Sequence, residues 1–443
     1  MTTARGGRPP SRALLYCTFN GAANCTNGIG RQTQTLLGTL TRRWEKLTAI
    51  TGPFTPYLAI PEPGPATWAY DPHLLAATCR TVESRGGRIL PLAYDTTAAF
   101  WTPPVWRQLS QQAAETARTL AGRYDHVAVI AVDTPFAGTG RAFLEGALLP
   151  PGAGTVEILL TLYGTAYVHS HPAPDPGRLV WEQRSLTVAG QPGVRVADIG
   201  EAFTRHLITE YAVDPAHLVP YRCSLDLTAP DLQPMPAADA LQITATFGVP
   251  LDRPIVLAVG RTDPTKGFDQ LITAVAPLRD IVHLVAVIVA FSDADPLTRT
   301  YRQQIADAGL RATYVDRFTR DLPRALASLP HTVAVVCPSR GESLANLPFE
   351  VGLWARHQGP IVVAPALGGF PETITDLDNG LLYNPAEPGG LTAALQHVIA
   401  MDDTARSAIR QRAYHRVVRE RDVVTAYAET LTRAFTPTPD PTR

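Results

Sequence analysis

The sequence predicts two α/β units, each a parallel sheet covered by helices. The chain has 443 residues, more than one hydrophobic core usually organises. Apolar residues make up 45%, which is ample material for burial. Short apolar runs alternate with helical patterns along the chain, and this alternation is typical of doubly wound parallel sheets. Such sheets bind ligands at the carboxyl ends of their strands, so we expect a central cleft between the two units.

The first unit is expected over residues 1–227. Apolar runs predict strands at residues 13–19, 86–92, 126–132, 156–162 and 194–199. Patterns of helical period predict helices near residues 71–84, 105–121 and 200–211, and a helix over 29–40 that follows a loop of Gly and Asn after the first strand.

The second unit is expected over residues 241–410, after a segment rich in Pro and Asp at 227–240 that has the composition of a linker. Its strands are predicted at residues 254–260, 282–290, 312–316, 332–339 and 360–365. Residues 403–434 have a helical pattern and follow the last strand-like segment.

Charge and composition exclude several classes of protein. Lys and Arg number 39 against 40 for Asp and Glu, a balance that argues against binding to nucleic acid or a membrane surface. No apolar run approaches the roughly 18 residues of a membrane span. The first twelve residues contain no apolar segment, so we expect no signal peptide and a cytoplasmic protein. The five cysteines are scattered, which suggests neither a disulfide framework nor a metal site.

The segment PIVLAVGRTDPTKGFDQLITAV carries the clearest chemical pattern, a strand, a loop and a helix. Its loop contains Arg261 and Lys266, and Lys266 is one of only two lysines in the chain. Backbone amides at a helix N-terminus already favour anions, so the two cations could neutralise a diphosphate there. An ordinary surface turn is the alternative, but it does not explain why so rare a residue lies at this position.

Two glutamates follow the strand at 332–339. Glu342 lies in the loop and Glu350 about two turns into the next helix, so both can face one ligand. Carboxylates accept hydrogen bonds from the vicinal hydroxyls of a ribose or a hexose. Spaced glutamates are also common on solvated helix faces, and it is their place after a strand that favours a role in binding.

Two glycine-containing turns are weaker signals. GGFPE at 368–372 permits a tight turn and is interpreted as mainly structural. In NGIGRQ, Gly28 and Gly30 would let the backbone approach a phosphate at the start of a helix, although a plain strand–helix turn explains them equally well.

GRTDPTKG, the two glutamates and GGFPE, in this order and spacing, resemble the C-terminal domain of the retaining GT-B glycosyltransferases of family 4. The C-terminal half of the chain carries the most specific part of the resemblance, which covers about 150 residues. NGIGRQ and DPAHLVPYRCSLDL also fit, and TLYGTAYV with WEQRSL is most similar to actinobacterial mycothiol-pathway members. The resemblance to this family implies two Rossmann-like domains facing a cleft, with a C-terminal helix at about 415–435 that crosses back to the first domain.

The resemblance also implies a nucleotide-diphosphate sugar as co-substrate, no metal cofactor and retention at the anomeric carbon. Carried onto this chain, it assigns the diphosphate to Arg261 and Lys266, a donor-sugar hydroxyl to Glu342 and the ribose to Glu350. Gly30 would contribute an amide near the phosphates. The backbone of Ala345 and Asn346 would line the sugar, and Arg317 and Phe318 would flank the base.

Two departures lie at the sugar and acceptor end. Family members usually carry a His where this chain has Tyr163, and SLAN replaces a glycine-containing segment after Glu342. The diphosphate end is intact. We therefore expect transfer of a sugar from UDP or GDP to a small soluble acceptor in an antibiotic, aminocyclitol or thiol pathway. The linkage atom and the choice between monomer and homodimer stay open. The alternatives are a pseudo-glycosyltransferase or epimerase on the same fold and a non-catalytic nucleotide-sugar-binding regulator.

Overall fold

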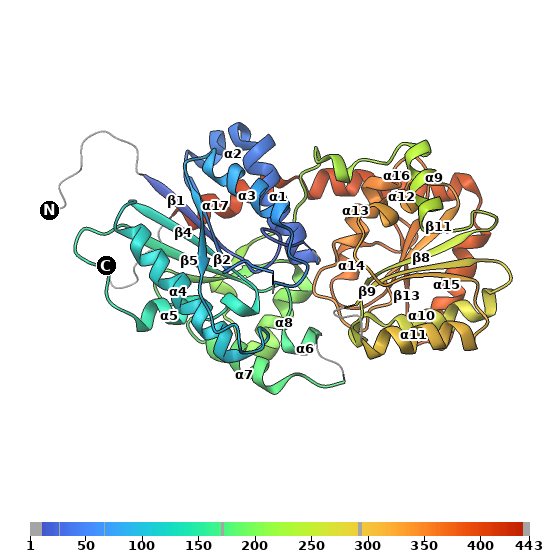
Figure 1. Ribbon diagram of the computed structural model, residues 1–443, viewed down its shortest axis with the longest axis horizontal. Helices are drawn as coiled ribbons and strands as arrows, with labels where there is room; N and C mark the ends of the chain where they lie inside the picture. The colour runs from blue at the N-terminus through green and yellow to red at the C-terminus, as the bar shows by residue number, and fades with distance from the viewer. Residues whose placement is uncertain (1–10, 26, 66, 170–171, 291–294, 437–443) are drawn as a thin grey trace. The chain divides into compact units, whose positions relative to one another are not determined.

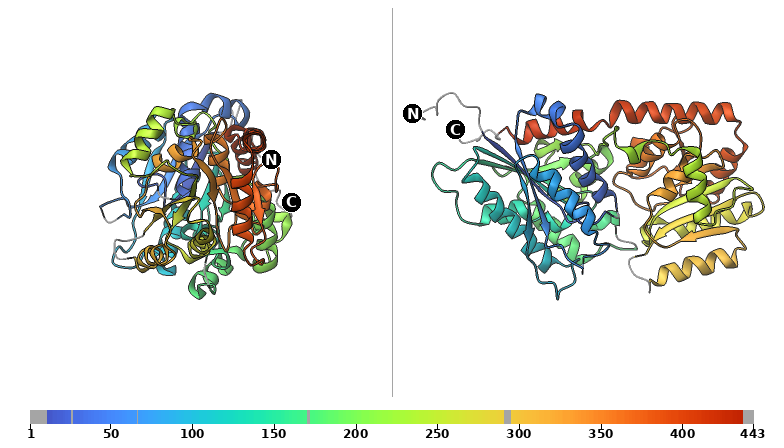
Figure 2. Two further views of the ribbon diagram at one scale, coloured as in Figure 1. Left: turned by 90° about the vertical axis from the view of Figure 1, so that its right-hand side faces the viewer. Right: turned by 45° about the horizontal axis from the view of Figure 1, so that its top comes forward.

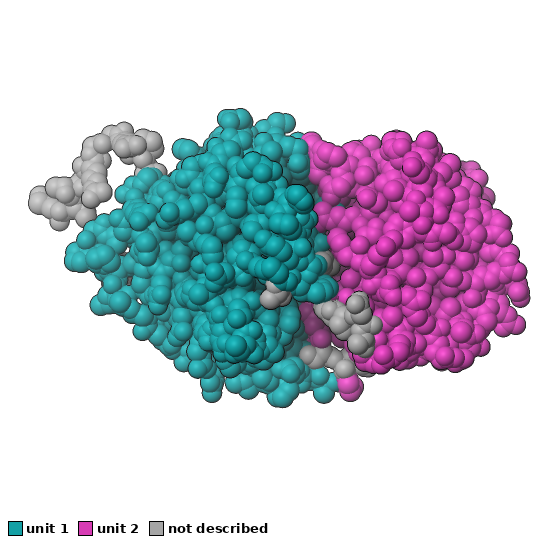
Figure 3. All heavy atoms as spheres, in the orientation of Figure 1, with its two compact units in different colours: residues 1–167, 173–226, 423–443 teal, residues 168–172, 227–422 magenta. Residues whose placement is uncertain are grey.

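The computed structural model describes residues 11–25, 27–65, 67–169, 172–290 and 295–436. The expectation that the first twelve residues form no signal peptide therefore concerns residues that lie mainly outside the described ones. The chain divides into two compact units (Figure 3). Unit 1 comprises residues 1–167, 173–226 and 423–443, and unit 2 comprises 168–172 and 227–422.

Unit 1 is built on a seven-stranded parallel sheet in the order β3-β2-β1-β4-β5-β6-β7. Its strands are β1 (Arg12–Cys17), β2 (Thr55–Pro61), β3 (Arg88–Leu92), β4 (His126–Val132), β5 (Thr155–Thr161), β6 (Val194–Asp198) and β7 (Leu218–Pro220). The order reverses direction between β1 and β4, and that position is the switch point of the sheet.

Helices cover both faces of this sheet (Figure 1). On one face α1 (Gly28–Arg42) packs against α2 (Trp44–Thr51), α3 (Pro72–Glu83) and α17 (Val423–Ala434). On the other face α4 (Pro103–Ala121) packs against α5 (Thr139–Glu145) and α7 (Pro176–Leu186). The remaining helices of the first half are α6 (Ala166–His169) and α8 (Glu201–Tyr211).

Unit 2 repeats the architecture with a six-stranded parallel sheet in the order β10-β9-β8-β11-β12-β13. Its strands are β8 (Ile255–Arg261), β9 (His283–Val289), β10 (Ala312–Val315), β11 (Thr332–Val336), β12 (Ile361–Pro365) and β13 (Leu381–Tyr383). Its switch point lies between β8 and β11.

The sheet of unit 2 also lies between two helical layers (Figure 1). One layer contains α10 (Phe268–Val275), α11 (Pro296–Asp307) and α15 (Gly390–Ala400). The other contains α9 (Ala237–Thr246), α12 (Asp321–Ala327), α13 (Leu347–Trp354) and α16 (Asp403–Glu420), and the short α14 (Phe370–Thr373) follows β12.

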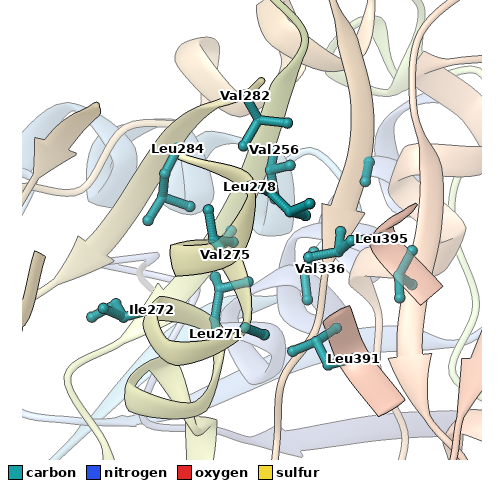
Figure 4. Close-up of a cluster of buried hydrophobic side chains, with 14 of the residues drawn as sticks. Val256, Leu271, Ile272, Val275, Leu278, Val282, Leu284, Val336, Leu391 and Leu395 are labelled. Carbon is teal, nitrogen blue, oxygen red and sulfur yellow. The ribbon is translucent and has the colours of Figure 1, made fainter. Parts of the chain in front are cut away.

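Alternate residues of the unit 2 strands enter two separate cores. Val256 of β8 and Leu284 of β9 pack with Leu271 of α10 on one face of the sheet (Figure 4). Their neighbours Ile255 and Val285 pack on the opposite face, with α12 and α13. A parallel strand covered on both sides is apolar at every position, which explains why its sequence forms a continuous apolar run.

The prediction of two doubly wound α/β units is confirmed. Three strands escaped the prediction for a physical reason. β2 contains two prolines, which lack the N–H that a sheet strand donates, so its sequence argued against a strand. β7 and β13 have three residues each and are too short for a period to be recognised.

The segment at 227–240, interpreted from composition as a linker, packs on unit 2. The Trp354 indole donates to the carbonyl of Asp231 at 2.9 Å, and Arg324 Nε donates to the carbonyl of Gln233 at 2.8 Å. The chain returns to unit 1 between α16 and α17. α16 packs against α13 in unit 2, and α17 packs on β7, β4 and β5 in unit 1; both helices are red in Figure 2.

No helix in the described part of the chain has both the length and the apolar character needed to cross a membrane. Within the same residues, no group of three or more His, Cys, Asp or Glu side chains is arranged to hold a metal ion.

Candidate functional site

The loops after β8 and β11 meet at the switch point of unit 2. The main-chain N–H of Arg340 donates to the carbonyl of Thr265 at 2.7 Å. Gly267 has φ +65°, and a Cβ at this position would lie 2.0 Å from the carbonyl oxygen of Pro338. Only glycine therefore lets the two loops approach so closely. This contact places the side chains of both loops at one edge of the sheet.

Lys266 and Glu342 form an ion pair at this edge. Lys266 Nζ lies 2.8 Å from Glu342 Oε2, and the two side chains are 19% and 12% exposed. Lys266 ends a 3-10 turn, Pro264–Lys266, whose N-cap is Asp263: its carboxylate accepts from the main-chain N–H of Thr265 at 2.9 Å. Both residues were predicted as site residues, but their direct contact was not predicted.

Arg261 is the last residue of β8 and lies in the same loop system. Its Nη2 is 3.6 Å from Asp263 Oδ2, and the Arg261 side chain is 26% exposed. Asp263 therefore serves twice, as the cap of the turn that carries Lys266 and as the counter-charge of Arg261. The two cations that the sequence singled out stand on one short, capped segment.

Arg340 holds the site together and was missed in the sequence. Its guanidinium makes two hydrogen bonds to the carboxylate of Asp269, at 2.9 and 2.5 Å, and a third to the carbonyl of Pro264 at 2.8 Å. Burial opposes ionisation of Asp269, but the hydrogen bonds and charge of Arg340 outweigh it and lower the pKa of Asp269. The sequence signal for this residue was an Arg four residues after the end of a buried strand.

The loop after β12 positions Glu342 through its backbone. The main-chain N–H of Gly369 donates to the Glu342 carbonyl at 3.0 Å. A Cβ on Gly368, where φ is +53°, would lie 2.1 Å from the same carbonyl oxygen. The GGFPE turn therefore has the structural role expected for it, and it supports the candidate site residue Glu342.

Glu350, Ala345 and Asn346 lie on the segment that continues from Glu342. Asn346 is the N-cap of α13, and its carbonyl accepts from the main-chain N–H of Glu350 at 3.2 Å. The sequence placed Glu350 about two turns into this helix, but it lies in the first turn, because α13 begins only at Leu347; there the helix dipole stabilises a negative charge. Ala345 is 7% exposed. Their expected contacts to ribose and sugar stay predictions.

Arg317 and Phe318 follow β10 at the outer edge of the sheet. Two strand spacings separate β10 from β8, roughly 10 Å in a sheet. Arg317 Cζ lies 5.1 Å from the centre of the Phe247 ring, and Arg320 Cζ lies 5.9 Å from that of Phe318. These residues are thus not brought next to Lys266, and their proposed role beside a base stays a prediction.

The glycines after β1 have local roles in unit 1. α1 begins at Gly28, and the amide of Gly30, which was expected to face a phosphate, donates to the N-cap side chain of Asn27 at 2.9 Å. A Cβ on Gly30 would lie 2.1 Å from Asn20 Oδ1. A larger residue here would therefore have to displace the Asn20 side chain.

Tyr163 follows β5 and packs among other tyrosines. Its ring centre is 6.3 Å from that of Tyr221, which lies 6.0 Å from Tyr427. Burial raises the pKa of Tyr163 well above its ordinary value. Its main-chain N–H donates to Asp133 Oδ1 at 3.2 Å, so the segment that carries Tyr163 is held by an acid at the end of β4.

Asp133 is the residue that sequence reasoning missed in unit 1. It directly follows β4, at the switch point beside β1, and is 5% exposed. Its φ of +63° and ψ of −175° lie in a region that glycine occupies almost alone. Burial raises the pKa of its carboxyl to about 6. In the sequence, the signal for this residue was an Asp that lies between an apolar strand and a Pro.

A buried ion pair lies beside Asp133. Arg178 Nε lies 2.6 Å from Glu182 Oε1, and Arg178 Nη2 donates to the carbonyl of Gly164 at 3.0 Å. Glu182 also accepts from the Tyr211 hydroxyl at 2.6 Å and from the main-chain N–H of Ala166 at 2.9 Å. Both carboxylate oxygens of Glu182 are thus engaged within α7, α8 and the loop after β5.

The two sheets and the loop constellation of unit 2 define a GT-B protein, and comparisons with known proteins agree. The chain superposes on sucrose-phosphate synthase from Thermosynechococcus elongatus with a TM-score of 0.70 at 18% identity, covering 95% of this chain and 98% of that one. Anabaena HepE in complex with UDP and glucose gives a TM-score of 0.67 at 17% identity, covering 95% and 99%. At such identities the likeness shows the fold.

Residues 241–416 match the family model described as "Glycosyl transferases group 1". D-inositol 3-phosphate glycosyltransferase from Frankia alni is 30% identical over 53% of this chain and 56% of its own length. A GDP-mannose-dependent phosphatidylinositol monomannoside mannosyltransferase from Mycolicibacterium smegmatis is 33% identical over 34% of this chain and 39% of its own. The chain thus spans about half the length of the first of these curated relatives, and less of the other.

Proposed function

We propose that this protein is a retaining glycosyltransferase that moves a sugar from a nucleotide-diphosphate donor to a small soluble acceptor. The observation that carries the proposal is the ion pair between Lys266 and Glu342, set beside Arg261 at the switch point of the unit that matches the family model. A site of this kind offers cations to a diphosphate and a carboxylate to hydroxyl groups.

The cations account for stabilisation of the leaving group. Cleavage of the bond between the sugar and the diphosphate leaves growing negative charge on the diphosphate oxygens. Lys266 ends a capped turn and Arg261 ends the strand before it, so both need little reorganisation to face that charge. The proposed reaction does not require a metal ion, because the two side chains supply the positive charge.

Glu342 has two functions in this proposal. Without donor, its carboxylate is the counter-charge of Lys266 and holds the ammonium in place. With donor bound, the diphosphate takes over the ammonium, and Glu342 accepts a hydrogen bond from a sugar hydroxyl. The main chain of Glu342 is held independently of the ion pair, because the N–H of Gly369 donates to its carbonyl.

Retention follows if the acceptor attacks the face that the diphosphate leaves. The acceptor hydroxyl then loses its proton to a phosphate oxygen of the departing group, while the new glycosidic bond forms at the anomeric carbon. Positioning of the two substrates, more than a dedicated base, would supply the rate enhancement. The relatives act, by their names, on an inositol phosphate and on a phosphatidylinositol mannoside, which supports a cyclitol-like acceptor.

The donor is tested by calorimetric titration of UDP, GDP, ADP and TDP, each with and without Mg²⁺. We expect one nucleotide to bind without the metal and the Lys266→Ala variant to bind it about 10- to 100-fold more weakly, the range of one charge-assisted hydrogen bond. Lys46→Ala is the matched control, because Lys46 is the only other lysine and is exposed on α2 of unit 1. Equal affinity in the two variants would refute the diphosphate assignment.

Product analysis then separates the reaction classes. Incubation with the nucleotide sugar and candidate acceptors should release the nucleoside diphosphate and give a product that keeps the donor's anomeric configuration. A new nucleotide sugar without transfer would indicate an epimerase. Nucleotide binding without turnover across a broad acceptor panel would indicate a regulator.

A further inference from the structure

The switch point of unit 1 carries a carboxylate in a strained backbone position. Asp133 is held there by the main-chain N–H of Tyr163 at 3.2 Å. The main chain of Thr134 also donates a hydrogen bond to this carboxylate. A carboxylate accepts up to about four hydrogen bonds, so these two donors leave capacity for a ligand. Strain of this kind concentrates at functional sites, and ligands of doubly wound sheets bind at the switch point.

The charged groups around Asp133 leave an excess of negative charge. Glu182 and Arg178 form a pair at 2.6 Å, and Nη2 of Arg178 donates to the Gly164 carbonyl. When Asp133 is ionised, two carboxylates face one guanidinium. In a buried site this surplus repels an anionic ligand and attracts a cationic one, because little water screens it.

Six aromatic side chains extend from the same edge of unit 1. Trp181 donates its indole N–H to the carbonyl of Thr134, the residue after Asp133, at 2.8 Å. Ring contacts between centres 5.2 to 6.3 Å apart continue outward from it, through Trp106, Trp101, Phe100, Phe19 and Tyr94. We call these six residues the aromatic cluster.

The aromatic cluster is more than core packing. Trp101 is 51% exposed although it touches three other rings. The indole N–H of Trp106, a residue only 2% exposed, has no hydrogen-bond partner in the part of the chain that the structure describes. A buried donor of this kind requires an explanation, and a ligand hydroxyl would supply its acceptor.

We infer that Asp133 and the aromatic cluster form the acceptor subsite, and that the acceptor is a cyclic polyol carrying an ammonium group and no phosphate. Aromatic faces attract cations and stack on the C–H face of a ring, while the carboxylate binds the ammonium directly. The acceptor of the inositol-phosphate relatives carries, by its name, a phosphate that this site would repel. The inference rests on the proposed function and adds the acceptor class to it.

Three probes test the acceptor class: 2-deoxystreptamine, myo-inositol and D-myo-inositol 3-phosphate. Each is assayed with the wild-type chain and the nucleotide sugar whose nucleotide bound in the donor titration. We expect kcat/KM to be highest for the amine and lowest for the phosphate, with about a 10- to 100-fold preference for the amine over myo-inositol, the range of one charge-assisted hydrogen bond. Preference for the phosphate, or equal use of the three, would overturn the inference.

Variants assign the preference to the subsite. Asp133→Asn should lose the roughly 10- to 100-fold preference for the amine while the nucleotide affinity of unit 2 is unchanged. Glu115→Gln, at an exposed position of α4, is the matched control and should keep the preference. An amine preference that survives both Asp133→Asn and Trp101→Ala would overturn the assignment.

The two proposals fail in different ways. If no nucleotide binds, the proposed function fails and the acceptor inference fails with it. If a nucleotide binds and the phosphorylated probe is used as well as the amine or better, only the acceptor inference fails. The comparison of the three probes uses the wild-type chain and therefore decides the acceptor class even if Asp133→Asn does not fold.

Discussion

Replacing Asp133 by Asn should change how stability depends on pH, and the sign follows from the site. Burial raises the pKa of this carboxyl from its ordinary value of 3.8 to about 6. The folded state therefore holds the proton more tightly than the unfolded state, and Asp133 favours folding most below about pH 4. That contribution is lost as the pH rises through about 6.

The size of the effect follows from the shift. A difference of about two pKa units corresponds to about 3 kcal/mol as an upper value. The Asn side chain has no charge to desolvate, so the variant should match the wild type near pH 4. It should be more stable by about 1 to 3 kcal/mol at pH 7. The wild-type Asp would thus lower the free energy of unfolding at pH 7 in return for a charged site, as is common for functional residues.

Urea unfolding followed by tryptophan fluorescence is a suitable assay, because five of the six tryptophans lie in unit 1 and only Trp354 lies in unit 2. The quantity to compare is the difference in unfolding free energy between variant and wild type, at several pH values from about 4 to 7. Glu115→Gln provides the background for the loss of one carboxylate from an exposed position. A difference for Asp133→Asn that does not change with pH would refute the reasoning.

Three further variants test the packing of the two sites. Arg340→Met should weaken nucleotide binding about 10-fold in calorimetry by releasing the loop that carries Lys266; unchanged affinity would contradict this role. Gly267→Ala should lower the unfolding free energy of unit 2 by about 2 kcal/mol or more, because φ is +65° and the new Cβ meets a carbonyl; an unaltered urea midpoint would contradict it. Glu182→Ala should cost unit 1 about 3 to 5 kcal/mol by leaving Arg178 buried without its counter-charge, and a melting temperature like the wild type's would argue against the pair.

Much of the fold was predictable because its signals are local. Strands covered on both faces form continuous apolar runs, and β4 was predicted at the residues it occupies, 126–132. Loops with side chains that could bind a ligand follow such runs. Arg261, Lys266 and Glu342 could therefore be selected because each lies just after a predicted strand. The rarity of lysine singled out Lys266 in the same way.

The missing elements also have local explanations. β2 was not predicted because its prolines contradict the usual pattern of a strand, yet the structure places it between β1 and β3.

Asp133 could have been noticed in the sequence as an acidic residue directly after an apolar strand. Its importance became visible only through its backbone conformation and its burial, which no local pattern encodes.

The sequence by itself determined which residues form strands, helices and strand-end loops, because periodicity and turn chemistry act over a few residues. Only the tertiary structure decided which loops meet. Lys266 and Glu342 are 76 positions apart, and they touch because β8 and β11 are neighbours in the sheet. Asp133 likewise lies beside Glu182, which is contributed by a helix beyond β5. Strand order is a property of the whole packed sheet, so it alone brings distant charges into one site.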